Sequence, residues 1–104
     1  MLQKKFYDKV YEIVKQIPSG KVATYKQIAT VLHKPNYSRQ VGFALHNNPN
    51  PNIIPCHRVV NSKGMIAKGF AFGGKEMQKH LLQKEGVVIN NNKIDLNYYQ
   101  FKFL

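Results

Sequence analysis

Acidic residues are missing from the whole middle of this 104-residue sequence. All five Asp and Glu side chains lie within residues 8–12 or 76–95, so residues 13–75 contain none. The formal net charge is +11, and nine Lys and Arg side chains fall within the acid-free stretch. Such a stretch attracts a polyanion, and DNA or RNA is the usual one. Charge alone leaves a second interpretation open, a solvated basic surface that only aids solubility.

The sequence also has only one cysteine and no long apolar run. The single cysteine, Cys56, excludes an intramolecular disulfide, and no C-x-x-C or H-x-x-x-H spacing predicts a zinc site. No apolar run approaches the roughly 18–20 residues that span a bilayer, and residues 1–5 lack the apolar block of a signal peptide. With 43% hydrophobic residues, the chain should form one globular domain over residues 1–104. We expect a cytoplasmic monomer with no membrane partner.

Three segments in the first half have helical periodicity. Apolar residues predict a helix over residues 3–17, and Pro18-Ser19-Gly20 ends it. A second helix over residues 25–33 has Thr24 as its N-cap and Gln27 at the capping-box position. A third runs from residue 37 or 38 to about 47. Two short helices joined by a brief turn suggest a helix-turn-helix, whose second helix enters a DNA groove. Many small helical domains also contain such a pair, so the pattern alone is weak.

The second half should contain one further helix and short extended segments. Asn48–Pro55 is irregular, residues 57–60 are extended and residues 61–64 form a turn. A helix over residues 75–84 should bury Met77, Leu81 and Leu82, and Gly86 ends it. Residues 87–89 and 93–96 predict a small hairpin across the Asn run. The expected fold class is α+β, a small winged-helix-like helix-turn-helix domain with a short hairpin.

Cys56 has two possible roles on its local sequence. A lone cysteine is usually a small buried hydrophobe, and the aliphatic residues on either side favour burial. The following His57 and Arg58 favour a thiolate, because positive charge lowers the pKa of a thiol. Neighbouring residues of a strand point to opposite faces, so Cys56 and His57 meet only if the backbone turns. Pro55 makes such a turn plausible, and both roles stay open.

Several segments together resemble the O6-alkylguanine-DNA alkyltransferases, also called methylated-DNA–protein-cysteine methyltransferases. Pro55-Cys56-His57-Arg58-Val59 resembles the active-site motif of that family. The order and spacing of the other segments match over about residues 5–90. These segments are Gly20–Tyr25, which resembles the entry into the helix-turn-helix; Arg39–Gly42 with Asn48-Pro49, which resembles the recognition helix and hinge; and Leu81–Gly86, which resembles the closing helix.

The resemblance implies a role for each catalytic candidate. Cys56 would be the nucleophile that accepts the alkyl group, since a thiolate is the strongest nucleophile among side chains. His57 would take the thiol proton through a water, and Glu85 would orient the imidazole. Asn48 would tie the recognition helix to the active-site turn. Without the family, Glu85 could be a surface carboxylate, His57 an exposed strand residue and Asn48 a helix C-cap.

The resemblance also implies a DNA-binding side and a substrate loop. Tyr25 would protonate the departing guanine, and Arg39 would fill the base stack after the nucleotide flips out. Their alternatives are an ordinary aromatic of a first helical turn and a phosphate contact. The implied DNA-binding residues are Tyr25, Ser38, Arg39, Gln40 and Gly42, and the implied substrate loop contains Phe70, Ala71, Phe72 and Gly73.

This sequence departs from the family pattern in several places. The usual N-terminal domain has no counterpart here, as in the alkyltransferase-like proteins, which usually carry tryptophan at the position of Cys56 and bind damage without repairing it. The substrate loop usually reads Gly-Tyr-Ala/Ser-Gly-Gly, whereas residues 69–74 lose the hydroxyl and add Phe72. Phe43 stands where a second glycine is frequent.

The function implied is single-turnover repair of double-stranded DNA carrying O6-alkylguanine, with no metal or organic cofactor. Two other functions stay open: a damage sensor that flips alkylguanine without transfer, and a helix-turn-helix regulator in which Cys56 is inert. The presence of Cys56, His57 and Glu85 together argues against the sensor.

Overall fold

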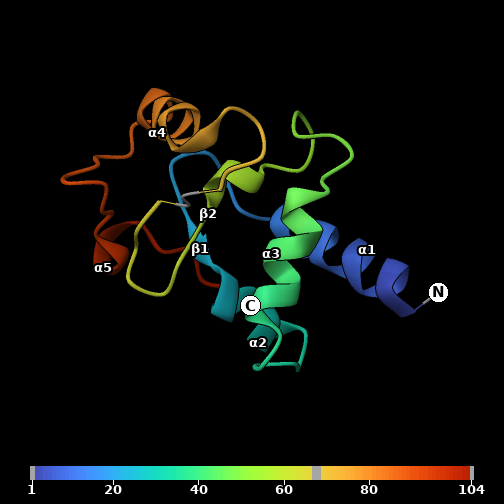
Figure 1. Cartoon of the computed structure of the whole chain (residues 1–104). Coiled ribbons are helices and arrows are strands. Elements are labelled where there is room, and N and C mark those ends of the chain that lie inside the picture. Colours follow the sequence, from blue (N-terminus) through green and yellow to red (C-terminus); the bar gives the residue numbers. More distant parts are fainter. Residues whose placement is uncertain (1, 67–68, 104) are drawn as a thin grey trace.

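The computed structural model describes residues 2–66 and 69–103 of the chain. Figure 1 shows its helices around a very small sheet. In chain order the elements are α1 (Leu2–Val14), β1 (Ala23–Thr24), α2 (Tyr25–Val31), α3 (Ser38–His46), the 3-10 turn η1 (Cys56–Arg58), β2 (Val59–Val60), α4 (Gly74–Lys84) and α5 (Leu96–Tyr99). The predicted α+β helix-turn-helix class is confirmed.

The three N-terminal helices share one hydrophobic core. α1, α2 and α3 pack against one another, and each contributes fully buried side chains at helical spacing. The Tyr11 hydroxyl of α1 donates a hydrogen bond of 2.7 Å to the carbonyl of Ala44, which joins α1 to α3. The fully buried side chains of these helices are Val10, Val14, Ile28, Ala29, Val41 and Ala44.

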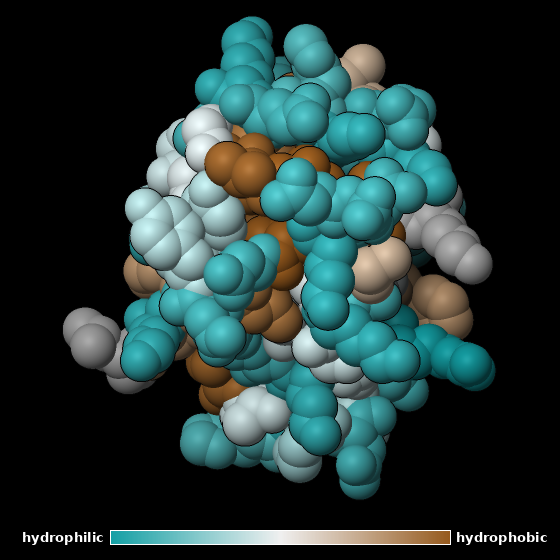
Figure 2. All heavy atoms as spheres, turned by 90° about the vertical axis from the view of Figure 1, so that its left-hand side faces the viewer, coloured by the Kyte–Doolittle hydropathy of each residue, from teal (hydrophilic) through white to brown (hydrophobic). Residues whose placement is uncertain are grey.

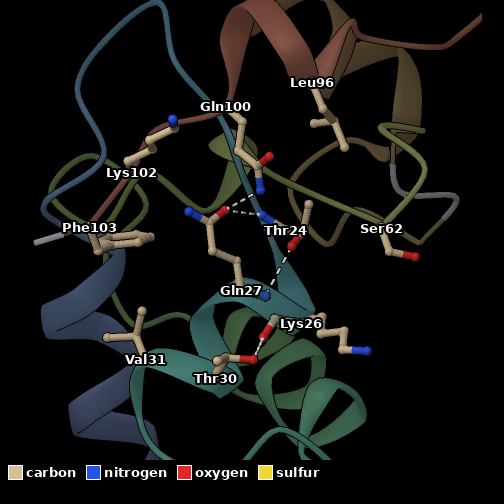
Figure 3. A pocket seen from close by; sticks show the side chains of 10 residues that line it. All are labelled: Thr24, Lys26, Gln27, Thr30, Val31, Ser62, Leu96, Gln100, Lys102 and Phe103. Carbon is tan, nitrogen blue, oxygen red and sulfur yellow. Dashed lines mark hydrogen bonds between the residues drawn. The ribbon is translucent and has the colours of Figure 1, made fainter.

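α2 begins at the predicted capping box. The Thr24 hydroxyl accepts from the Gln27 amide at 3.0 Å, and the Gln27 side chain accepts from the Thr24 amide at 3.2 Å. Gln27 also binds the C-terminal tail. Its side chain accepts from Gln100 at 2.9 Å (Figure 3) and donates to the carbonyl of Phe101. The start of the helix-turn-helix is therefore anchored to the last residues of the chain.

A parallel pairing joins the helix-turn-helix to the segment after Cys56. Ala23 of β1 pairs with Val59 of β2, and Thr24 pairs with Val60. All four side chains are buried. Because Tyr25 directly follows β1 and Cys56 lies just before β2, this pairing brings the start of α2 close to the cysteine.

The structure corrects several expected boundaries. α1 ends at Val14 rather than at residue 17. The expected hairpin across the Asn run is reduced to a tight turn in which Asn90 and Lys93 exchange backbone hydrogen bonds of 3.0 and 2.9 Å. The residues on either side of this turn form backbone hydrogen bonds with other segments. The Val87 amide donates to the carbonyl of Leu82, and the Ile94 amide donates to the carbonyl of Gly64.

Met77 is exposed rather than buried, with 42% of its surface accessible. Gln78 takes the inward position of α4 instead and is fully buried. The sequence pattern also missed α5, which Asp95 caps through a hydrogen bond of 3.0 Å to the Asn97 amide.

The side of the molecule shown in Figure 2 is the left-hand side of Figure 1, where α4, α5 and the chain between them lie. Most of its surface is hydrophilic, and hydrophobic atoms gather in a strip near the middle (Figure 2). A second buried cluster joins α4 to the segments that precede and follow it, and Leu96 and Tyr99 of α5 pack against it. This cluster consists of Val22, Val60, Ile66, Leu82, Val87 and Ile94.

Candidate active site around Cys56

Cys56 opens η1, so the expectation of extended backbone from His57 onward is wrong for His57 and Arg58. The Cys56 amide donates to the carbonyl of Ile54 at 2.7 Å, and the Arg58 amide donates to that of Pro55 at 2.9 Å. The backbone therefore turns after Pro55, as the sequence suggested. Because residues 56–58 are not a strand, the alternation that would place the side chains of Cys56 and His57 on opposite faces does not apply. Only 5% of Cys56 is exposed.

Burial raises the pKa of the Cys56 thiol above its ordinary value. Hydrogen bonds from the Asn48 side chain and from the backbone of Cys56 and His57 act in the opposite direction without overcoming burial. Of the two influences that the sequence indicates at Cys56, burial outweighs the positive charge of the neighbouring residues. The resting group is therefore a thiol.

A cavity of about 40 Å³ lies beside the thiol. A buried water needs about 10–15 Å³ by the same kind of measure, so the cavity has room for a few waters but not for a nucleobase. We call it the thiol cavity, and its walls come from α2, α3, η1 and the loop before α4. The lining residues are Tyr25, Gly42, Leu45, His46, Cys56, Gly69, Phe70 and Ala71.

The Glu85 carboxylate, at the end of α4, binds two basic side chains of η1. The His57 Nε2 atom lies 2.8 Å from Glu85 Oε2. Arg58 donates to the same carboxylate through Nη2 at 2.7 Å and through Nε at 3.0 and 3.2 Å. The side chains of His57, Arg58 and Glu85 are only 12%, 17% and 15% exposed. Arg58 also donates to the carbonyl of Ile17 at 2.7 Å, which anchors the group to the chain after α1.

Electrostatics assign one tautomer to His57. Burial alone would raise the pKa of Glu85, but hydrogen bonds from Arg58 and His57 hold it below its ordinary value, so Glu85 is ionised. An ionised carboxylate only accepts, so His57 Nε2 must carry the proton and donate it. Burial lowers the pKa of His57 despite Glu85, so the ring is neutral near neutral pH. Nδ1 of a neutral ring protonated on Nε2 has a free lone pair and can accept a proton.

Sequence reasoning missed two side chains that hold this turn. The sequence indicates Arg58 only as a positive neighbour of the thiol, whereas in the structure it pairs with Glu85. Gln78 is fully buried, and its amide donates to the carbonyls of His57 and Val59 at 3.0 Å each. A signal was present, because Gln78 and Glu85 are seven residues apart and so lie on one face of a helix.

Asn48 connects the end of α3 to the active-site turn. Its side chain is buried, donates to the carbonyl of Ile54 at 2.8 Å and accepts from the Asn50 amide at 2.9 Å. The Asn48 side chain also acts to lower the pKa of the Cys56 thiol, in opposition to burial. A simple C-cap would not explain these contacts, because they lead away from the helix and toward Cys56.

α3 presents two flanks besides its buried face. Gly42 lines the thiol cavity, whereas Gln40 lines a separate groove on the α1 side. At about 100° per residue, Arg39 points between these flanks and away from the core, and Ser38 opens the first turn. Within the part of the chain that the structure describes, the Arg39 guanidinium has no hydrogen-bond or ion-pair partner.

The loop before α4 covers the thiol cavity. Phe70 and Phe72 contact each other edge to face, with ring centroids 5.9 Å apart, and both pack against the core. The Phe70 carbonyl accepts from the Gly74 amide at 2.9 Å. Gly73 has a φ of 116°, and a Cβ there would lie 2.7 Å from the Cβ of Met77. The loop therefore requires glycine at this position.

A larger, open depression of about 610 Å³ lies between α2 and the tail (Figure 3). Lys26 and Lys102 are among its lining residues, and Cys56 is not.

Among residues 2–66 and 69–103, no group of three or more His, Cys, Asp or Glu side chains could hold a metal ion. No helix in the described ranges is both long enough and apolar enough to cross a membrane.

Comparison with known proteins identifies the family. The family described as 6-O-methylguanine DNA methyltransferase, DNA binding domain, matches residues 5–87. The chain belongs to this family. Its members act in DNA repair and damage recognition.

Two relatives and one solved structure locate the chain within the alkyltransferase family. Alkyltransferase-like protein 1 of Schizosaccharomyces pombe is 43% identical over 98% of this chain and 99% of its own length. A methylated-DNA–protein-cysteine methyltransferase of Cricetulus griseus is 37% identical over 75% of this chain, which spans 37% of that enzyme. The crystal structure of S. pombe Atl1 in complex with damaged DNA containing O6-carboxymethylguanine superposes with a TM-score of 0.84 at 42% identity, covering 95% of this chain and 96% of that one.

Proposed function

We propose that the protein repairs O6-alkylguanine in double-stranded DNA by moving the alkyl group irreversibly to Cys56. The observation that carries this proposal is the buried thiol beside a small cavity, followed directly by a neutral His57 that Glu85 orients at 2.8 Å. A nucleophile, a base and a group that orients the base are the three components of nucleophilic catalysis.

In the transfer step, side chains of the site supply the nucleophile, the base and the acid. The Cys56 sulfur attacks the alkyl carbon, the S–C bond forms and the bond from that carbon to guanine O6 breaks. The thiol proton passes to Nδ1 of His57, through a water as in our sequence-based expectation. The guanine leaves as an anion and takes a proton from Tyr25. Burial raises the pKa of Tyr25, so the phenol is protonated at neutral pH and has a proton to donate when the guanine leaves. The thioether product is stable, so each molecule acts once.

DNA would dock on α3. The net charge of +11, the exposed Arg39 and the family membership all support a DNA partner. Ser38, Gln40 and Gly42 share the helix with Arg39 and would contact the duplex. A stacked base cannot reach a buried thiol, so the lesion must flip out of the duplex. Arg39 would fill the gap that it leaves.

The loop over the thiol cavity must move when the lesion enters. A cavity of about 40 Å³ cannot hold a purine, and Phe70 and Ala71 form one of its walls. We infer that Phe70, Ala71, Phe72 and Gly73 make up the substrate loop, and that the size of the alkyl groups accepted depends on how far the two phenylalanine rings separate.

A second candidate function is damage recognition without transfer. The full-length match to alkyltransferase-like protein 1, together with the raised pKa of the thiol, favours it. Mass spectrometry after incubation with an O6-methylguanine duplex separates the two. Repair adds the mass of one methylene unit to the peptide that contains Cys56, and the Cys56→Ala variant gains nothing. An unchanged mass in a protein that still binds the damaged duplex would establish recognition alone.

Arg39 provides an independent test of flipping. Unstacking a base costs a few kcal/mol, so loss of the stack-filling side chain in Arg39→Ala should slow transfer on duplex DNA about tenfold or more. Arg39→Lys should also be slowed, because its ammonium cannot stack as a planar guanidinium does, but less than Arg39→Ala, because it keeps the positive charge. On the free base O6-benzylguanine, which needs no flipping, Arg39→Ala should react as fast as the parent. Equal slowing on both substrates would instead assign Arg39 to the fold or to the nucleophile.

A further inference from the structure

On the flank of α3 opposite the thiol cavity lies a groove of about 450 Å³ between α1 and the turn that precedes α3. Its rim carries Lys5, Lys9 and Lys34, and its aromatic walls include Phe6, Tyr37 and Phe43. We call it the lysine groove. None of its lining residues is acidic, and neither the nucleophile nor its supporting side chains belong to it.

We propose that the lysine groove holds the sugar-phosphate backbone of the strand opposite the lesion. The inference rests on the proposed docking of α3 on DNA. A helix seated in a groove of duplex DNA has one backbone along each of its flanks. The flank of α3 that contains Gly42 faces the thiol cavity and so meets the strand with the lesion. The flank that contains Gln40 and Phe43 lines the lysine groove and meets the complementary strand.

The chemistry of the groove fits an alternating sugar-phosphate chain. Lys5 and Lys9 are one turn apart on α1, so their side chains leave the same helix face about 6 Å apart along the axis. Lys34 Nζ lies 5.2 Å from the ring centroid of Tyr37. Such a contact holds a cation at the rim without neutralising it, so it can still meet a phosphate.

The aromatic walls suit the apolar faces of deoxyribose better than a stacked base. Phe6 and Tyr37 meet edge to face, with centroids 5.5 Å apart and planes 62° apart, and Lys34 covers one face of Tyr37. A stacked base needs an open ring face, which Tyr37 does not offer on that side. Phe43 is 54% exposed, and contact with the DNA backbone gives a role to this large exposed aromatic side chain.

The test compares duplex and single-stranded DNA that carry the same O6-methylguanine, with Cys56→Ala in every variant so that no transfer occurs. Lys5→Gln, Lys9→Gln and Lys34→Gln are combined, and the control combines Lys79→Gln, Lys84→Gln and Lys93→Gln, which changes the charge equally on and after α4. Five of these lysines are exposed, Lys79 is half-buried, and none of the six forms an ion pair within the described ranges, so both variants should fold.

We expect the groove variant to bind the duplex roughly tenfold more weakly, and the slope of log K against log salt to fall by about 0.9 for each phosphate that the variant no longer neutralises. Its affinity for the single strand should match that of the control variant, because the complementary strand is absent. Phe43→Ser, which leaves the charge unchanged, should also lower the affinity for the duplex more than the affinity for the single strand.

Equal weakening on duplex and single strand would overturn the proposal, since the lysines would then act only through the general field. Unchanged duplex binding would also overturn it and leave the groove to a protein partner. Either result is readable even if Cys56 transfers no alkyl group, because transfer is removed from the experiment.

Discussion

At the scale of single residues, the site depends on one carboxylate that two basic side chains share. Glu85 fixes the tautomer of His57, while Arg58 keeps Glu85 ionised and connects it to the chain after α1. The basicity of His57 and the local fold are therefore linked, because both depend on the same hydrogen bonds.

Arg58→Gln should lower the free energy of unfolding by about 2–4 kcal/mol, because it breaks a largely buried, charge-assisted pair and leaves Glu85 under-compensated. The other arginine of the chain is the matched control. Arg39→Gln removes the same charge from an exposed side chain that has no partner among residues 2–66 and 69–103, so its unfolding free energy should equal that of the parent. Urea denaturation measures both, and a loss of stability in Arg39→Gln similar to that in Arg58→Gln would contradict the role given to the pair.

Acid should destabilise the fold through His57. Its pKa in the folded protein lies below the ordinary 6.5, so the unfolded chain binds more protons when the pH falls below about 6.5. The stabilising contribution is complete above that pH and is lost as the pH falls toward the pKa of the folded state. Glu85 acts in the same direction below its ordinary 4.5. Between about pH 7.5 and about pH 5, the melting temperature of His57→Asn should fall less steeply than that of the parent. Equal slopes of melting temperature against pH would mean that His57 titrates normally.

At the scale of elements, the starts and ends of helices position the functional side chains. β1 and the capping box place Tyr25 at the first turn of α2, the end of α3 places Asn48, and the end of α4 places Glu85. The left-handed Gly73 sets where α4 begins and so where Gln78 and Glu85 meet η1.

Gly73→Ala should reduce stability by about 1–3 kcal/mol, the usual cost of a strained backbone conformation at a residue with a side chain. The added Cβ also meets the Cβ of Met77 at 2.7 Å. Gly69→Ala in the same loop is the control, because a Cβ there has nothing within 4 Å. Chemical denaturation compares the two variants, and equal stability would show that α4 can begin elsewhere without loss.

At the scale of the whole molecule, charge and fold cooperate. The basic, acid-free segment of residues 13–75 includes both helices of the helix-turn-helix, η1 and the loop up to α4. A protein that must find lesions in any sequence context should rely on phosphate contacts, and α3 with its two flanks would provide them.

Binding to undamaged duplex DNA should therefore be weak, independent of sequence and steeply dependent on salt, with about −0.9 in the slope of log K against log salt per phosphate neutralised. Fluorescence anisotropy with several unrelated duplexes over a salt series measures this dependence. A flat response to salt, or a strong preference for one undamaged sequence, would favour the regulator hypothesis over repair.

The sequence by itself determined the local features. Helical periodicity identified α1 to α4, Thr24 and Gln27 predicted the capping box, and Pro55 indicated the turn at Cys56, because each depends on a few neighbouring residues. Where tertiary contacts compete, local patterns failed. Residues 87–89 and 93–96 do not form their hairpin because their backbone groups bond to Leu82 and Gly64 instead.

Only the tertiary structure decided the chemistry of the site. The local sequence does not distinguish Arg58 as the partner of Glu85, because this contact joins segments far apart in the chain. The seven-residue spacing of Gln78 and Glu85 places both on one face of a helix, but only the fold shows that this face packs on η1 and buries the Gln78 amide. The resting state of Cys56 follows from the same cause. The sequence places positive charge beside the thiol, but burial in the folded protein removes water from the sulfur and raises its pKa, since desolvation penalises the charged form more than the neighbouring donors favour it.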